Sequence, residues 1–198
     1  MAIRERVLGT DHPSTATDYN NIGGVYYSQG DYPQALEYYF KALAIYERVL
    51  GTDHPNTATS YNNIGLVYDN QGDFPRALEY YFKALPILER VLGTDHPNTA
   101  SSYNNIGAVY DSQGDYPKAL DYYFKALAVK ERVLGTDHPS TATSYNNIGG
   151  VYYSQGDYSQ ALEYYQKAFN IFERVLGPDH PNTLLVKKHV EAVQAKMG

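Results

Sequence analysis

The chain has 198 residues, a net charge of −6 and no cysteine. Without cysteine it has no disulfide framework and no thiolate metal site, which fits a reducing compartment and predicts a cytoplasmic protein. The acidic balance argues against a nucleic-acid-binding face. No apolar run reaches the roughly 18 residues that would predict a membrane-spanning helix.

A unit of 42 residues recurs along the chain and sets the order of its elements. Residues 1–10 match the end of a unit, so we expect a truncated second helix of a preceding repeat and interpret the chain as an excerpt of a longer array. Four units follow, of which the first two differ at 8 positions, and residues 183–198 are expected to form a C-terminal capping helix. A fixed period predicts a solenoid, here one array over 1–198 with repeats at 15–56, 57–98, 99–140 and 141–182.

The first half of each unit has the pattern of an amphipathic helix. In the first unit this helix is expected over Thr15–Gln29, with Tyr19, Ile22, Gly23 and Tyr26 at the i, i+3, i+4, i+7 spacing of one helical face. Gly30 then supplies a helix stop.

The second half predicts a longer helix. Asp31 is the expected N-cap, with Gln34 three residues later as in a capping box. The helix is expected over Tyr32–Leu50, to end at Gly51, and to be followed by Asp53 as the N-cap of the next helix.

Small and charged side chains predict how the two helices lie. If they are antiparallel, Gly23 is expected to face Ala35 and Ala42, which would let the backbones approach closely. Carboxylate and lysine side chains four residues apart predict ion pairs on a solvated face, at Glu37/Lys41, Glu79/Lys83, Asp121/Lys125 and Glu163/Lys167.

These residues resemble the signature of the tetratricopeptide repeat, which is carried in the first unit by Tyr19, Ile22, Gly23, Tyr26, Gly30, Ala35, Tyr39 and Ala42. The loop Gly51–Pro55 and the run Tyr19–Ile22 are similar to the 42-residue variety in kinesin light chains and bacterial proteins. The resemblance implies an all-α fold, a right-handed superhelical solenoid of antiparallel helix pairs. It also implies a concave groove, lined by the first helices, that binds a peptide or partner protein, with no catalytic residue and no cofactor.

At about 100° per residue, one face of each first helix points away from the predicted core and toward this groove. Its candidate binding residues are Asn20, Asn21, Gly24, Tyr27 and Ser28; Asn62, Asn63, Leu66, Asp69 and Asn70; Asn104, Asn105, Ala108, Asp111 and Ser112; Asn146, Asn147, Gly150, Tyr153 and Ser154; and Lys188 in the last helix.

The paired asparagines have two possible roles. An amide offers both a donor and an acceptor, so a row of amides can bind an extended peptide backbone of any sequence, and the family resemblance carries that role to all eight. Alternatively, one asparagine of each pair bonds to an adjacent helix and only orders the stack.

The copies disagree at three groove positions, represented in the first unit by Gly24, Tyr27 and Ser28. Such variation is consistent with recognition specificity, or with drift at exposed positions after duplication. Asp69 and Asp111 would repel acidic segments, and Lys188 is the only groove cation expected, so we predict neutral or basic partners.

Other residue patterns predict no chemistry. Each histidine that follows an aspartate in the loops recurs once per unit, which would spread the rings along an edge and predicts a role in the loop or at a helix start rather than metal binding. Nothing marks an activated nucleophile. The function expected is therefore a protein–protein interaction scaffold. The alternative is a structural spacer or a module that self-associates head to tail through its ends.

Overall fold

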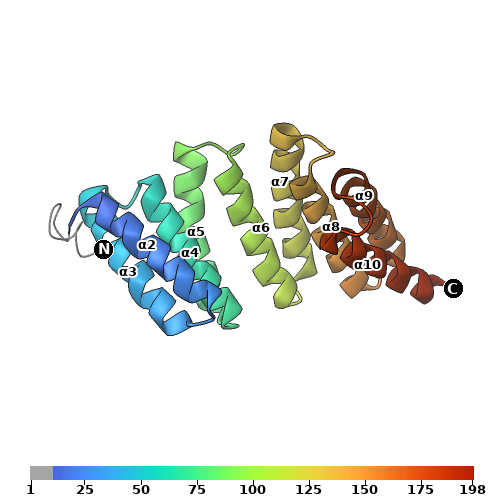
Figure 1. Cartoon of the computed structure of the whole chain (residues 1–198), viewed down its shortest axis with the longest axis horizontal. Coiled ribbons are helices and arrows are strands. Elements are labelled where there is room, and N and C mark those ends of the chain that lie inside the picture. Colours follow the sequence, from blue (N-terminus) through green and yellow to red (C-terminus); the bar gives the residue numbers. More distant parts are fainter. Residues whose placement is uncertain (1–10) are drawn as a thin grey trace. The chain divides into compact units, whose positions relative to one another are not determined.

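The computed structural model describes residues 11–198, which form helices joined by short loops, with no strand among them (Figure 1). These residues belong to two compact units that divide between Thr94 and Asp95. The predicted truncated helix at 1–10 lies outside the described residues. The first unit contains α2 (Pro13–Ser28), α3 (Tyr32–Val49), α4 (Pro55–Asn70) and α5 (Phe74–Val91). The second contains α6 (Pro97–Ser112), α7 (Tyr116–Leu134), α8 (Pro139–Gln155), α9 (Tyr158–Leu176) and α10 (Pro181–Met197).

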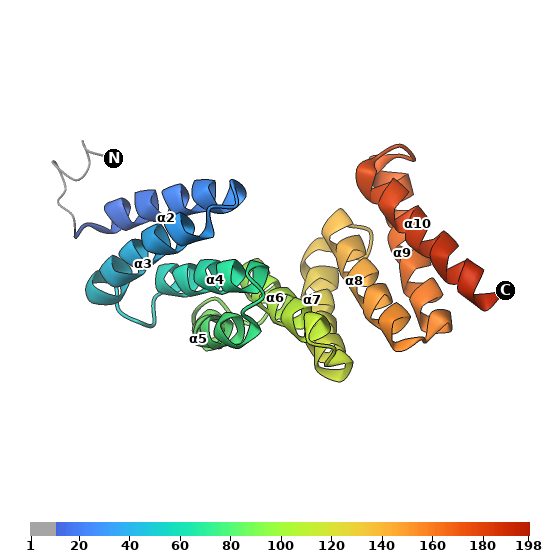
Figure 2. The ribbon, with the colours of Figure 1, turned by 90° about the horizontal axis from the view of Figure 1, so that it is seen from below.

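Each repeat is a pair of helices that run side by side in opposite directions, as α2 and α3 do in Figure 2. Within the first unit α3 also packs against α4, and within the second α7 packs against α8 and α9 against α10. The expected all-α fold of helix pairs is confirmed.

The first helix of every repeat begins at a histidine, not at the aspartate or threonine that the sequence suggested. His54 is the N-cap of α4, and its ring Nδ1 accepts a hydrogen bond from the backbone N–H of Asn56 at 3.1 Å. Pro55 follows at the first helical position, where a missing N–H is harmless. The expected cap at Asp53 and the expected start at Thr15 are therefore wrong by one and two residues. The same cap recurs at His12, His96, His138 and His180.

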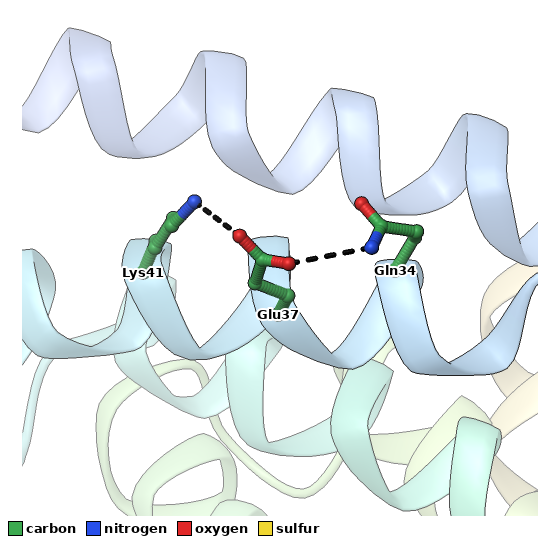
Figure 3. Close-up of polar contacts among 3 residues, drawn as sticks. All are labelled: Gln34, Glu37 and Lys41. Atoms are coloured by element: carbon green, nitrogen blue, oxygen red, sulfur yellow. Dashed lines mark hydrogen bonds and ion pairs between the residues drawn. The ribbon is translucent and has the colours of Figure 1, made fainter.

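The second helix begins at the predicted aspartate. Asp31 is the N-cap of α3, and its carboxylate accepts from the backbone N–H of Gln34 at 3.2 Å. The reciprocal half of the capping box is not formed, because the backbone N–H of Asp31 donates to the Tyr26 carbonyl at 2.9 Å. The Gln34 amide donates to Glu37, and Glu37 pairs with Lys41 at 2.6 Å (Figure 3). All four predicted ion pairs at this spacing are present.

Close packing within each pair depends on one glycine and one tyrosine. The expectation that Gly23 faces two alanines is wrong: the Tyr39 ring lies over Gly23, and a Cβ added there would be 2.7 Å from its carbons. A helical glycine is unfavourable by itself, but here it makes room for a large aromatic ring. Gly65 stands in the same relation to Tyr81.

Further polar contacts join the ends of each repeat and neighbouring repeats. Arg90 near the end of α5 pairs with Asp53 in the loop before α4 at 2.7 Å, and the equivalent ion pairs are Arg48–Asp11, Arg132–Asp95 and Arg174–Asp137. The Tyr61 hydroxyl of α4 donates to Glu47 of α3 at 2.5 Å. Each helix pair is thus closed on itself and tied to the next pair in its unit.

Candidate functional site

The predicted groove residues lie on the first helices α2, α4, α6 and α8, with Lys188 on α10. In the first unit, a cleft of about 500 Å³ is bounded by α2, α3 and α4 and is lined by Thr17, Asn20, Asn21, Gly24, Tyr39, Tyr46, Asn56, Thr59 and Asn63. In the second unit, a cleft of about 330 Å³ is lined by Asp111, Gly150, Tyr153, Ser154, Tyr165, His189 and Ala192.

Eight of the predicted residues are therefore brought together, four in each cleft. The first cleft holds Asn20, Asn21, Gly24 and Asn63, and the second holds Asp111, Gly150, Tyr153 and Ser154. The other predicted residues line neither of these two clefts: Tyr27, Ser28, Asn62, Leu66, Asp69, Asn70, Asn104, Asn105, Ala108, Ser112, Asn146, Asn147 and Lys188.

Several asparagine amides are engaged between neighbouring first helices. Asn20 on α2 donates to the Ser60 hydroxyl of α4 at 3.1 Å, and the Ser60 hydroxyl lies 3.3 Å from the Asn20 carbonyl oxygen. Asn147 on α8 donates to Asn104 on α6 at 3.1 Å. Asn146 contacts the His189 ring of α10 at 2.9 Å. These amides hold adjacent repeats in register.

Other asparagines are not used in this way. Asn21 is exposed and Asn63 is half-buried, and both line the first cleft from facing helices. Neither amide bonds to another group within the described part of the chain. A half-buried amide without a partner retains its capacity to donate and to accept.

The position of Tyr27 in the repeat holds a tyrosine in the first and fourth repeats and an aspartate in the two middle repeats. The Tyr27 hydroxyl accepts a hydrogen bond from the Asn70 amide at 2.8 Å, which links α2 to α4. In the two middle repeats this position holds Asp69 and Asp111, and burial raises the pKa of each carboxyl above its ordinary value. A carboxylate that is partly removed from water gains most from a cationic partner.

Tyrosines from the second helices also reach the clefts, and the sequence analysis did not select them. Tyr39 is 5% exposed and lines the first cleft, while Tyr165 is 5% exposed and lines the second. Burial raises the pKa of both hydroxyls, that of Tyr165 to about 12. The sequence does contain a signal for them, because each follows a first-helix glycine by 16 residues, as Tyr39 follows Gly23.

The two clefts differ in charge. The first is lined only by uncharged side chains. The second contains Asp111 and His189, and burial lowers the pKa of the His189 ring, which favours the neutral form. Lys188 is exposed on α10, whose contribution to this cleft is His189 and Ala192. Neither cleft therefore presents a lysine or arginine to a ligand.

The tetratricopeptide repeat family model matches the sequence in overlapping segments, at residues 1–47, 19–89, 70–131, 113–174 and 145–198. Comparison with curated protein sequences finds no match. Within residues 11–198, no helix is both long and apolar enough to cross a membrane.

Solved structures share the fold. BtubC (BKLC) from P. vanneervenii has 27% sequence identity and a TM-score of 0.75, over 86% of this chain and 68% of that one. A candidate kinesin light chain of Podosopora anserina with nearly identical TPR-like repeats has 22% identity and a TM-score of 0.76, over 94% and 98% of the two chains. The apo form of RapI has 21% identity and a TM-score of 0.72, over 93% and 70%.

Proposed function

Because the chain belongs to the tetratricopeptide repeat family, we propose that it is a protein-interaction scaffold whose first helices bind an extended segment of a partner protein. The observation that carries this proposal is the first cleft. There Asn21 and Asn63 project from α2 and α4 with amides that no other described group engages. An extended peptide supplies alternating donors and acceptors that such amides can bind.

The two asparagines of a pair then have different roles. Asn20 is bonded to Ser60 between repeats, so we assign the first asparagine of the pair to ordering the stack. We assign the second one, represented by Asn21 and Asn63 of the first cleft, to contact with the partner. Asn147 is the exception, because it donates to Asn104.

We further propose that the bound segment is neutral or basic. The first cleft lacks a lysine or arginine, and the second contains Asp111, whose carboxyl is partly buried. An acidic segment would meet like charge at Asp111 without a compensating cation, which is unfavourable in a partly desolvated site. A lysine or arginine of the partner would instead stabilise the ionised carboxylate.

The test is a selection of random peptides displayed on phage against the full chain, followed by measurement of Kd for the enriched peptides. Replacing Asn21 and Asn63 together with alanine removes up to two hydrogen bonds of about 0.5–1.5 kcal/mol each, which predicts a loss of affinity of about fivefold or more. Gln71→Ala is the matched control, because it removes an exposed amide just beyond α4. Unchanged affinity in the double variant, or enrichment of acidic peptides, would contradict the proposal.

Self-association is the second candidate function. Its support is the exposed apolar surface of α10, where Leu184, Leu185 and Met197 are 45%, 50% and 51% exposed. Sedimentation velocity over a roughly hundredfold concentration range tests it, with Leu184→Glu/Leu185→Glu as the disrupting variant. A monomer at all concentrations would eliminate this candidate and leave the first one intact.

A further inference from the structure

Every repeat contains one tyrosine whose ring stands on a glycine of the preceding helix. The four tyrosines are Tyr39, Tyr81, Tyr123 and Tyr165, all at most 5% exposed. Their glycines are Gly23, Gly65, Gly107 and Gly149, where an added Cβ would lie 2.7–2.8 Å from the ring. The position of each hydroxyl is thus fixed by the fold.

The residue that follows each of these glycines varies. It is Gly24 in the first repeat, Leu66 in the second, Ala108 in the third and Gly150 in the fourth. A Cβ added at Gly24 would lie 3.7 Å from the Tyr39 hydroxyl, and one added at Gly150 would lie 3.6 Å from the Tyr165 hydroxyl. The residue at this position therefore decides what lies directly above the hydroxyl.

The two glycine repeats are open above the hydroxyl. Gly24 and Tyr39 line the first cleft together, and Gly150 and Tyr165 line the second. Neither hydroxyl bonds to another described group, although both tyrosines are only 5% exposed. Because each tyrosine lines its cleft, a ligand group that enters the cleft can form a hydrogen bond with the hydroxyl.

The leucine repeat is closed. Tyr81 is 0% exposed, and its hydroxyl is a buried polar atom without a hydrogen-bond partner. Leu66 stands at the position of this repeat that corresponds to Gly24, and Tyr81 and Leu66 line neither of the two clefts.

Packing within the fold does not explain Gly24. Gly23 is required, because any side chain there would collide with the Tyr39 ring. At Gly24 an added Cβ would make only an ordinary van der Waals contact, and glycine is less favourable than alanine inside a helix. The adjacent glycines of the first and fourth repeats therefore provide space over the hydroxyl that the helix pair itself does not need.

We propose that Gly24 and Gly150 each open a recognition pocket, one in each unit, in which the Tyr39 and Tyr165 hydroxyls bind a hydrogen-bonding side chain of the partner, while Leu66 closes the same position over Tyr81. The inference rests on the proposed function and adds which repeats recognise a side chain of the partner. The first pocket takes an amide or hydroxyl side chain, because its walls are the uncharged polar groups of Thr17, Asn20, Asn21 and Asn63.

A peptide enriched on the unmodified chain provides the first test. Gly24→Leu copies the closed repeat and is expected to lower its affinity at least about tenfold, and Tyr39→Phe is expected to lower it about fivefold. Tyr81→Phe is the matched control and leaves affinity unchanged, since that hydroxyl is sealed in the protein. Equal affinities for Tyr39→Phe, Gly24→Leu and the unmodified chain would overturn the inference. If the Asn21→Ala/Asn63→Ala variant binds more weakly than the unmodified chain in that case, peptide binding along the first helices survives and only the pockets fail.

A second measurement needs no selected peptide. N-methylacetamide, a small uncharged amide, is titrated into the full chain and followed by NMR at the backbone N–H signals of Gly24, Leu66 and Gly150. Saturable shifts are expected at both glycines and not at Leu66, and Leu66→Gly is expected to gain one. Shifts that are equal at all three residues, or linear with concentration throughout, would refute the pockets. Circular dichroism of each variant verifies that its helix content is retained.

Discussion

Replacing Tyr81 with phenylalanine removes a single oxygen atom from the interior of the first unit and leaves the aromatic ring in place over Gly65. The side chain is 0% exposed and its hydroxyl has no hydrogen-bond partner. Burial raises the pKa of this hydroxyl far above its ordinary value, and the charge of Asp69 adds to the shift. On folding, the hydroxyl therefore loses its hydrogen bonds to water and forms no hydrogen bond within the protein.

The expected gain in stability follows from that imbalance. A buried polar group that lacks a partner costs about 1–3 kcal/mol, and removing the oxygen leaves a small void that offsets part of the gain. We expect Tyr81→Phe to raise the free energy of unfolding by about 1 kcal/mol. The same change at Tyr61 is expected to act in the opposite direction, because that hydroxyl donates to Glu47 at 2.5 Å. Losing a hydrogen bond to a charged group costs about 1.5–3 kcal/mol.

Urea titration followed by far-ultraviolet circular dichroism measures both variants against the unmodified chain at equal protein concentration. The midpoint is expected to rise for Tyr81→Phe and to fall for Tyr61→Phe, with unchanged slopes. On heating, about 1 kcal/mol corresponds to about 2–4 °C in Tm for a chain of this size. A lower midpoint for Tyr81→Phe would refute the reasoning, since it would show that the hydroxyl is satisfied in the folded protein.

Three further changes test the packing, electrostatics and caps. Gly65→Ala places a Cβ 2.7 Å from the Tyr81 ring. Overpacking of about 1–3 kcal/mol should outweigh the gain in helix propensity and lower the urea midpoint. Gly24→Ala should raise the midpoint, because a Cβ there makes only an ordinary contact. Burial lowers the pKa of Lys130, so the unfolded chain binds the proton more tightly and stability should rise as pH increases from that lowered pKa toward the ordinary value. Lys130→Met should lack this rise. His54→Ala should lose about 1 kcal/mol with the N-cap, and His54→Asn should restore most of it; equal midpoints for these two variants would rule out the cap.

Local rules predicted most of the helix pairs. Asp31 caps α3 as expected, because a short side-chain acceptor three residues before a free backbone N–H acts within one turn. The ion pair of Glu37 and Lys41 also depends only on helix geometry. The sequence did not identify the histidine caps, because the aspartate one residue earlier is the commoner N-cap residue. Only the structure shows that the helix begins at Pro55 and that the ring of His54 is the hydrogen-bond acceptor.

The candidate site was less predictable, because it depends on contacts between repeats. The helical period placed Asn20 and Asn21 on one face but could not show that Ser60, 40 residues later, engages only the first of them. Tyr39 belongs to the repeat signature, and it is buried in the structure. That its hydroxyl also opens onto a cleft follows from the absence of a side chain at Gly24, on a different helix.

The ion pairs that close each helix pair bear on how such a chain can change length. Arg90 and Asp53 lie 37 positions apart and so fall inside one stretch of 42 residues, as do Arg132 and Asp95. Because the pairs repeat at the same period, genetic recombination that removes or inserts 42 residues in frame still leaves each aspartate 37 positions before an arginine. An array built this way can be lengthened or shortened without leaving an arginine or aspartate unpaired. Near-identical copies also supply the sequence similarity that recombination requires.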